Sequence, residues 1–179
     1  MSTKREELMA EITKWQPKIS NDDTFLELAF FKIFVKFENF LTDTIIDYAT
    51  GTISNPSKVE RRLDFVDRDH FKKTTNLSYL DTGDKTKILV DQLFTDSNKI
   101  SFFFNSSDNE FFEKMKALRN YIAHESIESK NRYIRKTLNN KEFMTPNDFL
   151  KSKNRGDKDS MYTKFIDIVS TYAADIDFN

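Results

Sequence analysis

One short stretch of the sequence carries residue types suited to acid–base chemistry beside a phosphate. Arg119, Asn120 and His124 lie within the segment Arg-Asn-Tyr-Ile-Ala-His. Imidazole titrates near neutral pH and can give or take a proton. A guanidinium keeps its charge and donates hydrogen bonds in a fork that matches phosphate oxygens. An amide four residues before a histidine shares its helix face and can hydrogen-bond the ring or the phosphate.

Composition argues against several other chemistries. The chain has no cysteine, which excludes disulfides, thiol nucleophiles and cysteine-based metal sites. Its two histidines, His70 and His124, stand far apart in the sequence, so a paired-histidine metal motif is missing. We therefore predict no metal site and no cofactor. His70, which lies among charged residues, is interpreted as a surface or packing residue.

A helix over residues 108–124 is predicted to position Arg119, Asn120 and His124. Residues 107–110, Ser-Asp-Asn-Glu, have the pattern of a capping box and indicate where this helix begins. With about 100° between successive residues, Asn120 and His124 fall opposite the apolar stripe, and Arg119 flanks it. On this projection the core stripe is Phe111, Met115, Leu118 and Ile122, and the polar side also holds Glu113, Lys116 and Ala117.

Helical periodicity dominates the remaining chain as well. Only three glycines and three prolines are present, so the chain has few of the residues that favour tight turns. The longest predicted helix covers 25–50, with a Thr24–Glu27 capping box and Gly51 as its stop. The other expected helices cover 1–18 (ended by Pro17), 58–73, 85–94, 126–139 and 159–176. In the helix over 58–73 the residues expected inward or near the boundary are Leu63, Val66, His70 and Phe71. Residues 99–104 are expected to form an apolar connector, with Phe102–Phe104 in the core or a dimer contact, and a loop or short helix is expected between 139 and 159.

The sequence as a whole predicts a single all-α domain over 1–179, an up-and-down helical bundle. Hydrophobic residues make up 38% and charged residues 32%, a globular balance. No apolar run approaches the roughly 20 residues that a membrane span needs, and no signal peptide is evident. We therefore expect no membrane contact and a cytoplasmic location.

Residues 118–125, Leu-Arg-Asn-Tyr-Ile-Ala-His-Glu, resemble the signature of the HEPN superfamily, in which Arg and a polar residue precede His at the end of a bundle helix. The resemblance implies a compact helical bundle that commonly dimerises. Many members are metal-independent ribonucleases of toxin–antitoxin, abortive-infection and CRISPR-associated systems. Carried over, Arg119 and His124 would be catalytic, and Asn120 would orient or bind the phosphate.

From the chemistry of metal-independent RNA cleavage we also predict a dimer. The ribose 2′-OH attacks the neighbouring phosphorus, which requires a base, an acid and positive charge on the phosphate oxygens. The one histidine of the motif, His124, cannot readily be both acid and base in one step. A symmetric homodimer that brings two copies of His124 together would supply both in a composite site.

Basic residues are concentrated directly after the motif. Residues 130–155 carry a local excess of positive charge, although the whole chain has a net charge of −1. This stretch is interpreted either as an ordinary solvated face or as a phosphate-binding rim. The predicted RNA contacts are Lys116, Lys130, Arg132 and Arg135, with Tyr133 for base stacking.

Three functions remain open from the sequence. The first is a HEPN endoribonuclease that cuts cellular or phage RNA in a toxin–antitoxin, abortive-infection or antiviral setting, with an antitoxin or defence-system protein as partner. HEPN toxins paired with nucleotidyltransferase antitoxins carry a tyrosine two residues after the histidine, where this chain has Ser126, which argues against that kind of antitoxin. The second is a catalytically silent HEPN-like module that binds nucleotide or protein. The third is a helical partner-binding protein in which the Arg119–His124 pattern is accidental.

Overall fold

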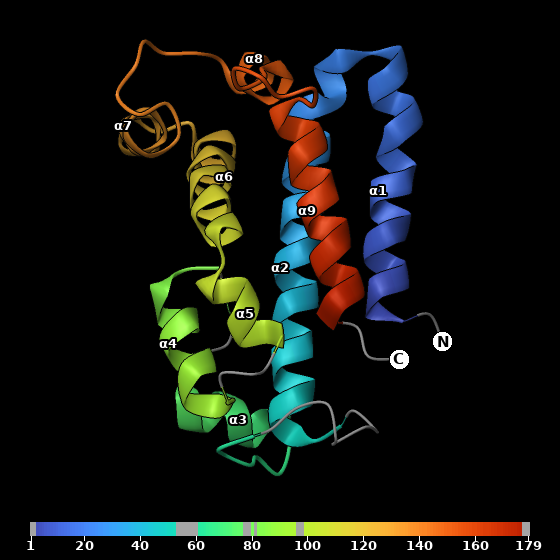
Figure 1. Cartoon of the computed structure of the whole chain (residues 1–179), viewed down its shortest axis with the longest axis vertical. Coiled ribbons are helices and arrows are strands. Elements are labelled where there is room, and N and C mark those ends of the chain that lie inside the picture. Colours follow the sequence, from blue (N-terminus) through green and yellow to red (C-terminus); the bar gives the residue numbers. More distant parts are fainter. Residues whose placement is uncertain (1–2, 53–60, 77–79, 81, 96–98, 177–179) are drawn as a thin grey trace.

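The protein is built from helices, as the sequence predicts (Figure 1). The computed structural model describes residues 3–52, 61–76, 80, 82–95 and 99–176. Within these ranges the one strand-like feature is a single antiparallel bridge between Arg61 and Phe94. The helices are α1 (Lys4–Asn21), α2 (Leu26–Thr50), α3 (Arg68–Thr75), α4 (Asp84–Leu93), α5 (Lys99–Asn105), α6 (Ser107–His124), α7 (Ile127–Lys136), α8 (Pro146–Lys151) and α9 (Met161–Ile176), with a 3-10 turn, η1 (Asp23–Phe25), before α2.

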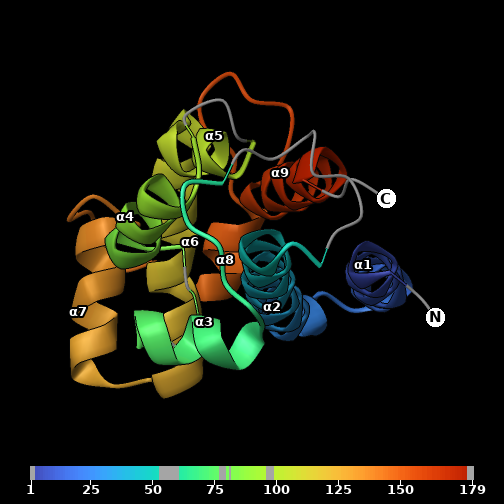
Figure 2. The same cartoon turned by 90° about the horizontal axis from the view of Figure 1, so that it is seen from below.

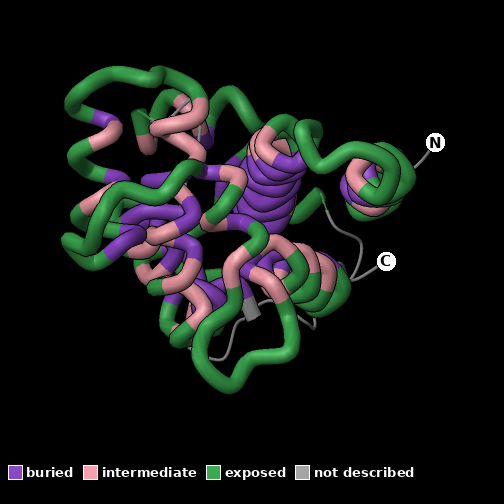
Figure 3. Tube along the Cα trace, turned by 90° about the horizontal axis from the view of Figure 1, so that it is seen from above, coloured by how far each residue is buried: buried purple, intermediate pink, exposed green. Residues whose placement is uncertain are grey.

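Helix α2 is the central element of the fold. It packs against α1 and α9 on one side and against α6 on the other (Figures 1 and 2). Its apolar residues surround most of the helix, so burial follows α2 almost continuously (Figure 3). The helix ends where Gly51 adopts a φ of 70°, a conformation that glycine reaches without steric cost. The predicted long helix and its stop are both confirmed.

Aromatic side chains join the helices around α2. Phe34 of α2 stacks on Phe165 of α9 with ring centroids 5.7 Å apart, and Phe37 stacks on Phe112 of α6 at 5.1 Å. Phe103 of α5 meets Phe112 edge-to-face at 5.3 Å. All five rings are fully buried. Such pairs each add about 0.5–1.5 kcal/mol beyond the burial of their apolar surface.

Helix α6 is covered on two sides, more than its sequence indicates. Met115 and Leu118 are buried toward the core, as predicted. The side predicted to be polar is partly covered by α7, which makes Ala117 only 4% exposed. The hydroxyl of Thr137, just after α7, donates to the carbonyl of Lys114 at 2.8 Å and fixes the two helices together. Placing Ala117 on an open face was therefore wrong.

The start of the chain differs from the prediction in two respects. Pro17 does not end α1, which continues to Asn21. Proline removes the hydrogen bond to the carbonyl of Thr13, but both residues face solvent, where water can replace it. The Thr24–Glu27 capping box is absent, because Asp22 caps η1 and Glu27 accepts a hydrogen bond from the backbone of Asn147 at 2.9 Å.

The predicted helix over 58–73 is shorter in the structure and begins at Arg68; residues 58–60 lie outside the described part. Before α3 the backbone makes remote contacts instead. The amide of Arg62 donates to Leu93 at 2.7 Å, and that of Phe65 donates to Ala49 at 3.2 Å. This extended path leaves the side chains of Leu63 and Val66 exposed, so their inward placement was wrong.

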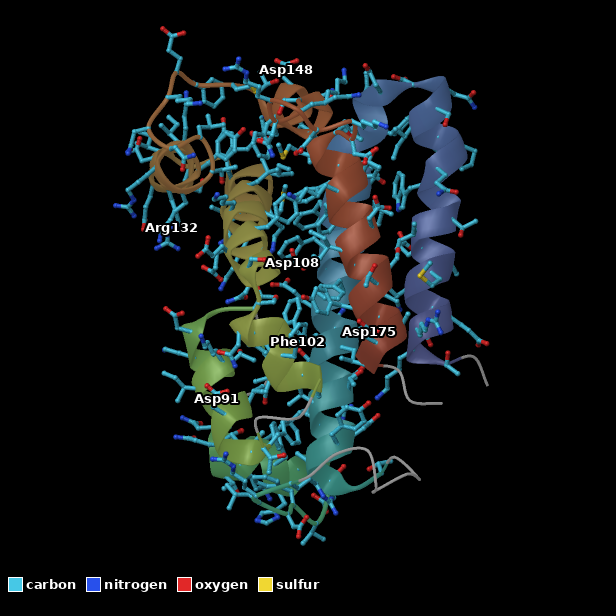
Figure 4. All side chains as sticks on the ribbon, in the orientation of Figure 1. Asp91, Phe102, Asp108, Arg132, Asp148 and Asp175 are labelled. Atoms are coloured by element: carbon cyan, nitrogen blue, oxygen red, sulfur yellow. The ribbon has the colours of Figure 1, made fainter. Side chains whose placement is uncertain are left out.

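Residues 99–105 form helix α5 rather than a connector without regular structure. Phe103 and Phe104 are buried in the core, while Phe102 is exposed (Figure 4). Helix α6 begins at Ser107, one residue before the predicted start, and its N-cap is Ser106, which makes no side-chain cap bond, so the predicted Ser107–Glu110 capping box was wrong. The predicted helices at 85–94, 126–139 and 159–176 are present as α4, α7 and α9, and a short α8 lies between the last two.

None of the helices that the structure describes has both the length and the apolar composition needed to cross a bilayer.

Candidate functional site

The end of α6 and the first turns of α7 border an open recess of about 530 Å³. Helix α6 stops after His124 because Glu125 adopts a left-handed conformation with φ 46°. Ser126 then caps α7, accepting a hydrogen bond from the backbone of Ser129 at 3.1 Å. This two-residue turn brings α7 back along α6. The recess, named here the α6–α7 recess, is lined by Asn120, His124, Ser126, Glu128, Ser129 and Arg132.

Three groups in the α6–α7 recess can act on an anionic substrate. His124 is exposed, and Asn120, one helical turn earlier, is half-buried on the same side of α6. Arg132 enters from α7 and is exposed at the outer edge of the molecule (Figure 4). The structure thus places Asn120 and His124 together on an accessible face, as their helical spacing predicts.

The side chain of Arg119, in contrast, points into the protein. Its Nη2 donates to both carboxylate oxygens of Glu38 on α2, each at 2.6 Å. The guanidinium carbon also lies 5.4 Å from the centre of the Phe34 ring. Only 17% of the Arg119 side chain is exposed, against 1% for Glu38. From its position beside the apolar stripe, Arg119 could point toward the core or toward solvent. The buried carboxylate of Glu38 holds it toward the core.

Glu38 is the residue that sequence reasoning missed. Among the described residues it is the only charged side chain that is fully buried. A signal was present, because Glu38 interrupts the apolar stripe of α2 between Phe34, Phe37 and Leu41. A carboxylate at such a position needs a cationic or donating partner, since an unpaired buried charge is strongly disfavoured. The sequence does not reveal that this partner is Arg119.

Arg119 also contacts its neighbour in the chain. Its Nη1 donates to Oδ1 of Asn120 at 2.7 Å. Glu38, Arg119 and Asn120 therefore form a continuous hydrogen-bonded chain that runs from the core to the α6–α7 recess. The Nε atom of Arg119 is buried and has no hydrogen-bond partner within the described structure.

Tyr133 is not available for base stacking, so that prediction was wrong. Its side chain is fully buried, and its ring stacks on Tyr121 with centroids 5.3 Å apart. Its hydroxyl donates to the carbonyl of Met144 at 3.2 Å. Burial is the main cause that raises its pKa well above the ordinary 10.0. Tyr133 faces the core because α7 packs this side against α6.

The other predicted RNA contacts lie around the recess but do not line it. Lys116 is mostly covered and approaches Glu113 at 3.8 Å. Lys130 places its ammonium 4.3 Å from the centre of the Phe143 ring. Arg135 is exposed on α7, one turn beyond the recess. Of these cations, only Arg132 is a lining residue.

The second histidine, His70, is exposed on α3, which agrees with its interpretation as a surface residue and not with an inward position on that helix. Its Nδ1 accepts a hydrogen bond from the backbone of Val66 at 3.2 Å. Helix α3 lies at the opposite end of the molecule from α7 (Figure 1). His70 and His124 therefore belong to separate regions of the same chain.

Comparison with known proteins adds no relative to this description. No family model, curated protein or solved structure matches the chain. The site is consequently defined by its own residues and geometry.

Proposed function

We propose that this chain is a metal-independent endoribonuclease of the HEPN type, active at the α6–α7 recess. The observation that carries the proposal is the convergence of an imidazole, an amide and a guanidinium, from His124, Asn120 and Arg132, in one accessible recess. Its volume of about 530 Å³ falls within the roughly 300–1,000 Å³ of ligand-binding pockets. The Arg119–His124 motif supports the same assignment through its resemblance to HEPN proteins.

The reaction is an internal transfer at phosphorus. The 2′-oxygen forms a bond to phosphorus, the bond to the 5′-oxygen breaks, and a 2′,3′-cyclic phosphate remains. The proton of the 2′-OH passes to a base, and an acid protonates the departing 5′-oxygen. His124 performs one of these transfers. Asn120 and Arg132 stabilise the negative charge on the phosphate oxygens that do not bridge the two nucleotides.

A second copy of the chain completes the pair of proton-transfer groups. Each recess contains one histidine, so the partner subunit's His124 supplies the other transfer in a symmetric dimer. The surface beside the recess suits such an interface. Ile127 follows His124 by three residues, and its side chain is 82% exposed although it is apolar. Contact with a second copy would cover this residue and bring the two recesses together.

The charge around α7 favours an RNA substrate. Lys130, Arg132 and Arg135 are on α7, and the chain as a whole has a net charge of only −1. Helix α7 therefore carries a net positive charge beside the recess, although Glu128 also lines it, and this charge would attract the phosphate backbone. A toxin–antitoxin, abortive-infection or antiviral setting fits an enzyme of this kind, with an antitoxin or defence-system protein restraining it.

A catalytically silent module is the second candidate. The observation that favours it is the ion pair between Arg119 and Glu38, which neutralises the positive charge of the motif arginine. Such a module would bind nucleotide or a partner protein at the recess and would not cleave RNA. Binding without cleavage is the result that separates it from the enzyme.

The test is cleavage of single-stranded RNA or tRNA by the purified protein in EDTA. Wild type is compared with His124→Ala and Arg119→Ala. We expect wild type to cut and both variants to lose most of the activity. Cleavage that persists undiminished in His124→Ala would remove the site assignment, and a requirement for Mg²⁺ would remove the mechanism.

A further inference from the structure

Glu38 and Arg119 act on the recess through Asn120. We infer that they form a positioning pair that fixes the Asn120 amide with its NH₂ group toward the recess, while Arg132 provides the cation that contacts the phosphate. The inference rests on the ribonuclease function proposed above. It gives the arginine of the Arg119–His124 motif an indirect role and makes Glu38 a functional residue.

The first step concerns the orientation of the Asn120 amide. A guanidinium can only donate hydrogen bonds, so the Asn120 atom that faces Nη1 of Arg119 must be the oxygen. The distance of 2.7 Å between Nη1 and Oδ1 is that of a charge-assisted bond. The NH₂ group is left with both of its protons to donate. Asn120 lines the recess, and it therefore acts there as a donor to a phosphate oxygen.

The second step concerns Arg119 itself. Its Nη2 is held by both oxygens of Glu38 at 2.6 Å, and Phe34 lies against the guanidinium. To reach a phosphate in the recess, Arg119 would have to abandon a carboxylate that is 1% exposed. That movement would leave Glu38 as an unpaired buried charge, a strongly disfavoured state. Arg119 is consequently suited to holding Asn120 in place and poorly suited to contacting substrate.

The third step identifies the cation that is available. Arg132 is an exposed lining residue of the recess. Within the part of the chain that the structure describes, Arg132 forms no ion pair, not even with Glu128, which lines the same recess, so its fork of donors is open to a phosphate. Lys130 and Arg135, on either side of it along α7, do not line the recess. The geometry therefore assigns phosphate contact to Arg132.

The orientation of Asn120 is tested by two substitutions at that position. Asn120→Ala removes the donor, and we expect kcat to fall about 10²-fold, as for loss of one donor to a developing oxyanion. Asn120→Asp keeps an oxygen for Arg119 but directs a second, anionic oxygen toward the phosphate. We expect Asn120→Asp to be slower than Asn120→Ala by at least about tenfold. An Asn120→Asp enzyme as active as Asn120→Ala would overturn the proposed orientation.

The division of roles between the two arginines is tested by the salt dependence of RNA binding. The probe is a 2′-O-methylated single-stranded oligonucleotide, which lacks the attacking hydroxyl. Each phosphate contact contributes about 0.7 to the slope of log K against log salt concentration. We expect Arg132→Gln to reduce the slope by about 0.7. Arg5→Gln, on the distant helix α1, is the control and should leave it unchanged.

For Arg119, the double variant Glu38→Gln/Arg119→Gln is used, because it leaves no unpaired charge in the core. We expect it to bind the oligonucleotide with the wild-type salt slope, while kcat for cleavable RNA falls and KM changes little. A reduced slope in this variant, with none in Arg132→Gln, would show that Arg119 is the phosphate contact. If the double variant fails to fold, the comparison of Asn120→Asp with Asn120→Ala still decides the inference.

Failure of the positioning role differs from failure of the proposed function. Wild-type protein that neither binds nor cleaves RNA contradicts the ribonuclease proposal, and the positioning role falls with it. Wild-type protein that cleaves RNA, with the two Asn120 variants in the opposite order, contradicts the positioning role alone.

Discussion

At the scale of single residues, the chain provides its own control for the proposed chemistry. His124 and His70 are the only histidines, and both are exposed; helix α3, which carries His70, lies at the opposite end of the molecule from α7, which follows His124 (Figure 1). We expect His124→Ala to lower kcat by about 10²–10⁴-fold, the usual contribution of a general acid or base. His70→Ala should leave kcat unchanged. Equal losses in the two variants would point to a general effect of removing a histidine and against a site at the recess.

The partly buried phenol of Tyr162 gives a second prediction at this scale. Burial raises the pKa of Tyr162 from its ordinary 10.0 to about 12. The folded state therefore disfavours the phenolate, so this contribution to stability is complete below pH 10 and is lost as the pH rises from 10 towards 12. In urea titrations over this range we expect Tyr162→Phe to lose stability less steeply than wild type. Parallel pH profiles for the two proteins would contradict the role assigned to Tyr162.

The sequence predicted some residues of the site and not others, for identifiable reasons. The exposure of Asn120 and His124 follows from helix geometry alone, because both lie away from a clear apolar stripe. The direction of Arg119 could not be deduced, since its partner, Glu38, comes from another helix much earlier in the chain. The burial of Tyr133 depends on how α7 packs against α6 after the turn between them. The residue types of α7 alone do not predict that packing.

At the scale of helices, the Glu38–Arg119 pair joins α2 to the end of α6. Glu38→Ala leaves Arg119 with a charge in the core and no carboxylate, and we expect the free energy of unfolding to fall by about 3–5 kcal/mol. The double variant Glu38→Leu/Arg119→Met replaces the pair with apolar groups and should recover most of that loss. Urea denaturation measures both.

The same comparison can contradict the pairing. If the destabilisation of the double variant equals the sum of the losses in Glu38→Leu and Arg119→Met, the two side chains do not interact energetically. The distinction is large enough to exceed the error of linear extrapolation, which is about 10–15% of the total.

Helices were predicted well where a long apolar stripe repeats with helical period. They were predicted poorly where contacts with residues remote in the sequence determine the local structure. Periodicity was sufficient for α2, α6 and α9, each of which has a long apolar stripe packed in the core. It failed at residues 61–67, whose backbone is held by Leu93 and Ala49. It also failed at α5, where a run of three phenylalanines obscures the difference between a strand and a short buried helix.

At the scale of the whole molecule, the proposed mechanism requires two copies. We expect light scattering to give twice the 21.2 kDa of the chain at assay concentrations. Ile127→Asp should return the mass to that of one chain and abolish cleavage together with it, because a charge at the interface opposes association.

A matched control exists for this substitution. Val66 is as exposed as Ile127 but adjoins α3, at the other end of the molecule (Figure 1). Val66→Asp should leave the mass and the activity unchanged. An Ile127→Asp protein that is monomeric yet fully active would show that one recess suffices.

The central claim is that the recess containing His124 cleaves RNA by attack of the 2′-OH. The most direct measurement is mass spectrometry of the fragments formed from a defined RNA in EDTA. Wild type should leave a 2′,3′-cyclic phosphate on the 5′ fragment and a 5′-hydroxyl on the 3′ fragment, and His124→Ala should leave the RNA intact. Fragments with a 5′-phosphate and a 3′-hydroxyl, or cyclic phosphate formed equally by His124→Ala, would contradict it.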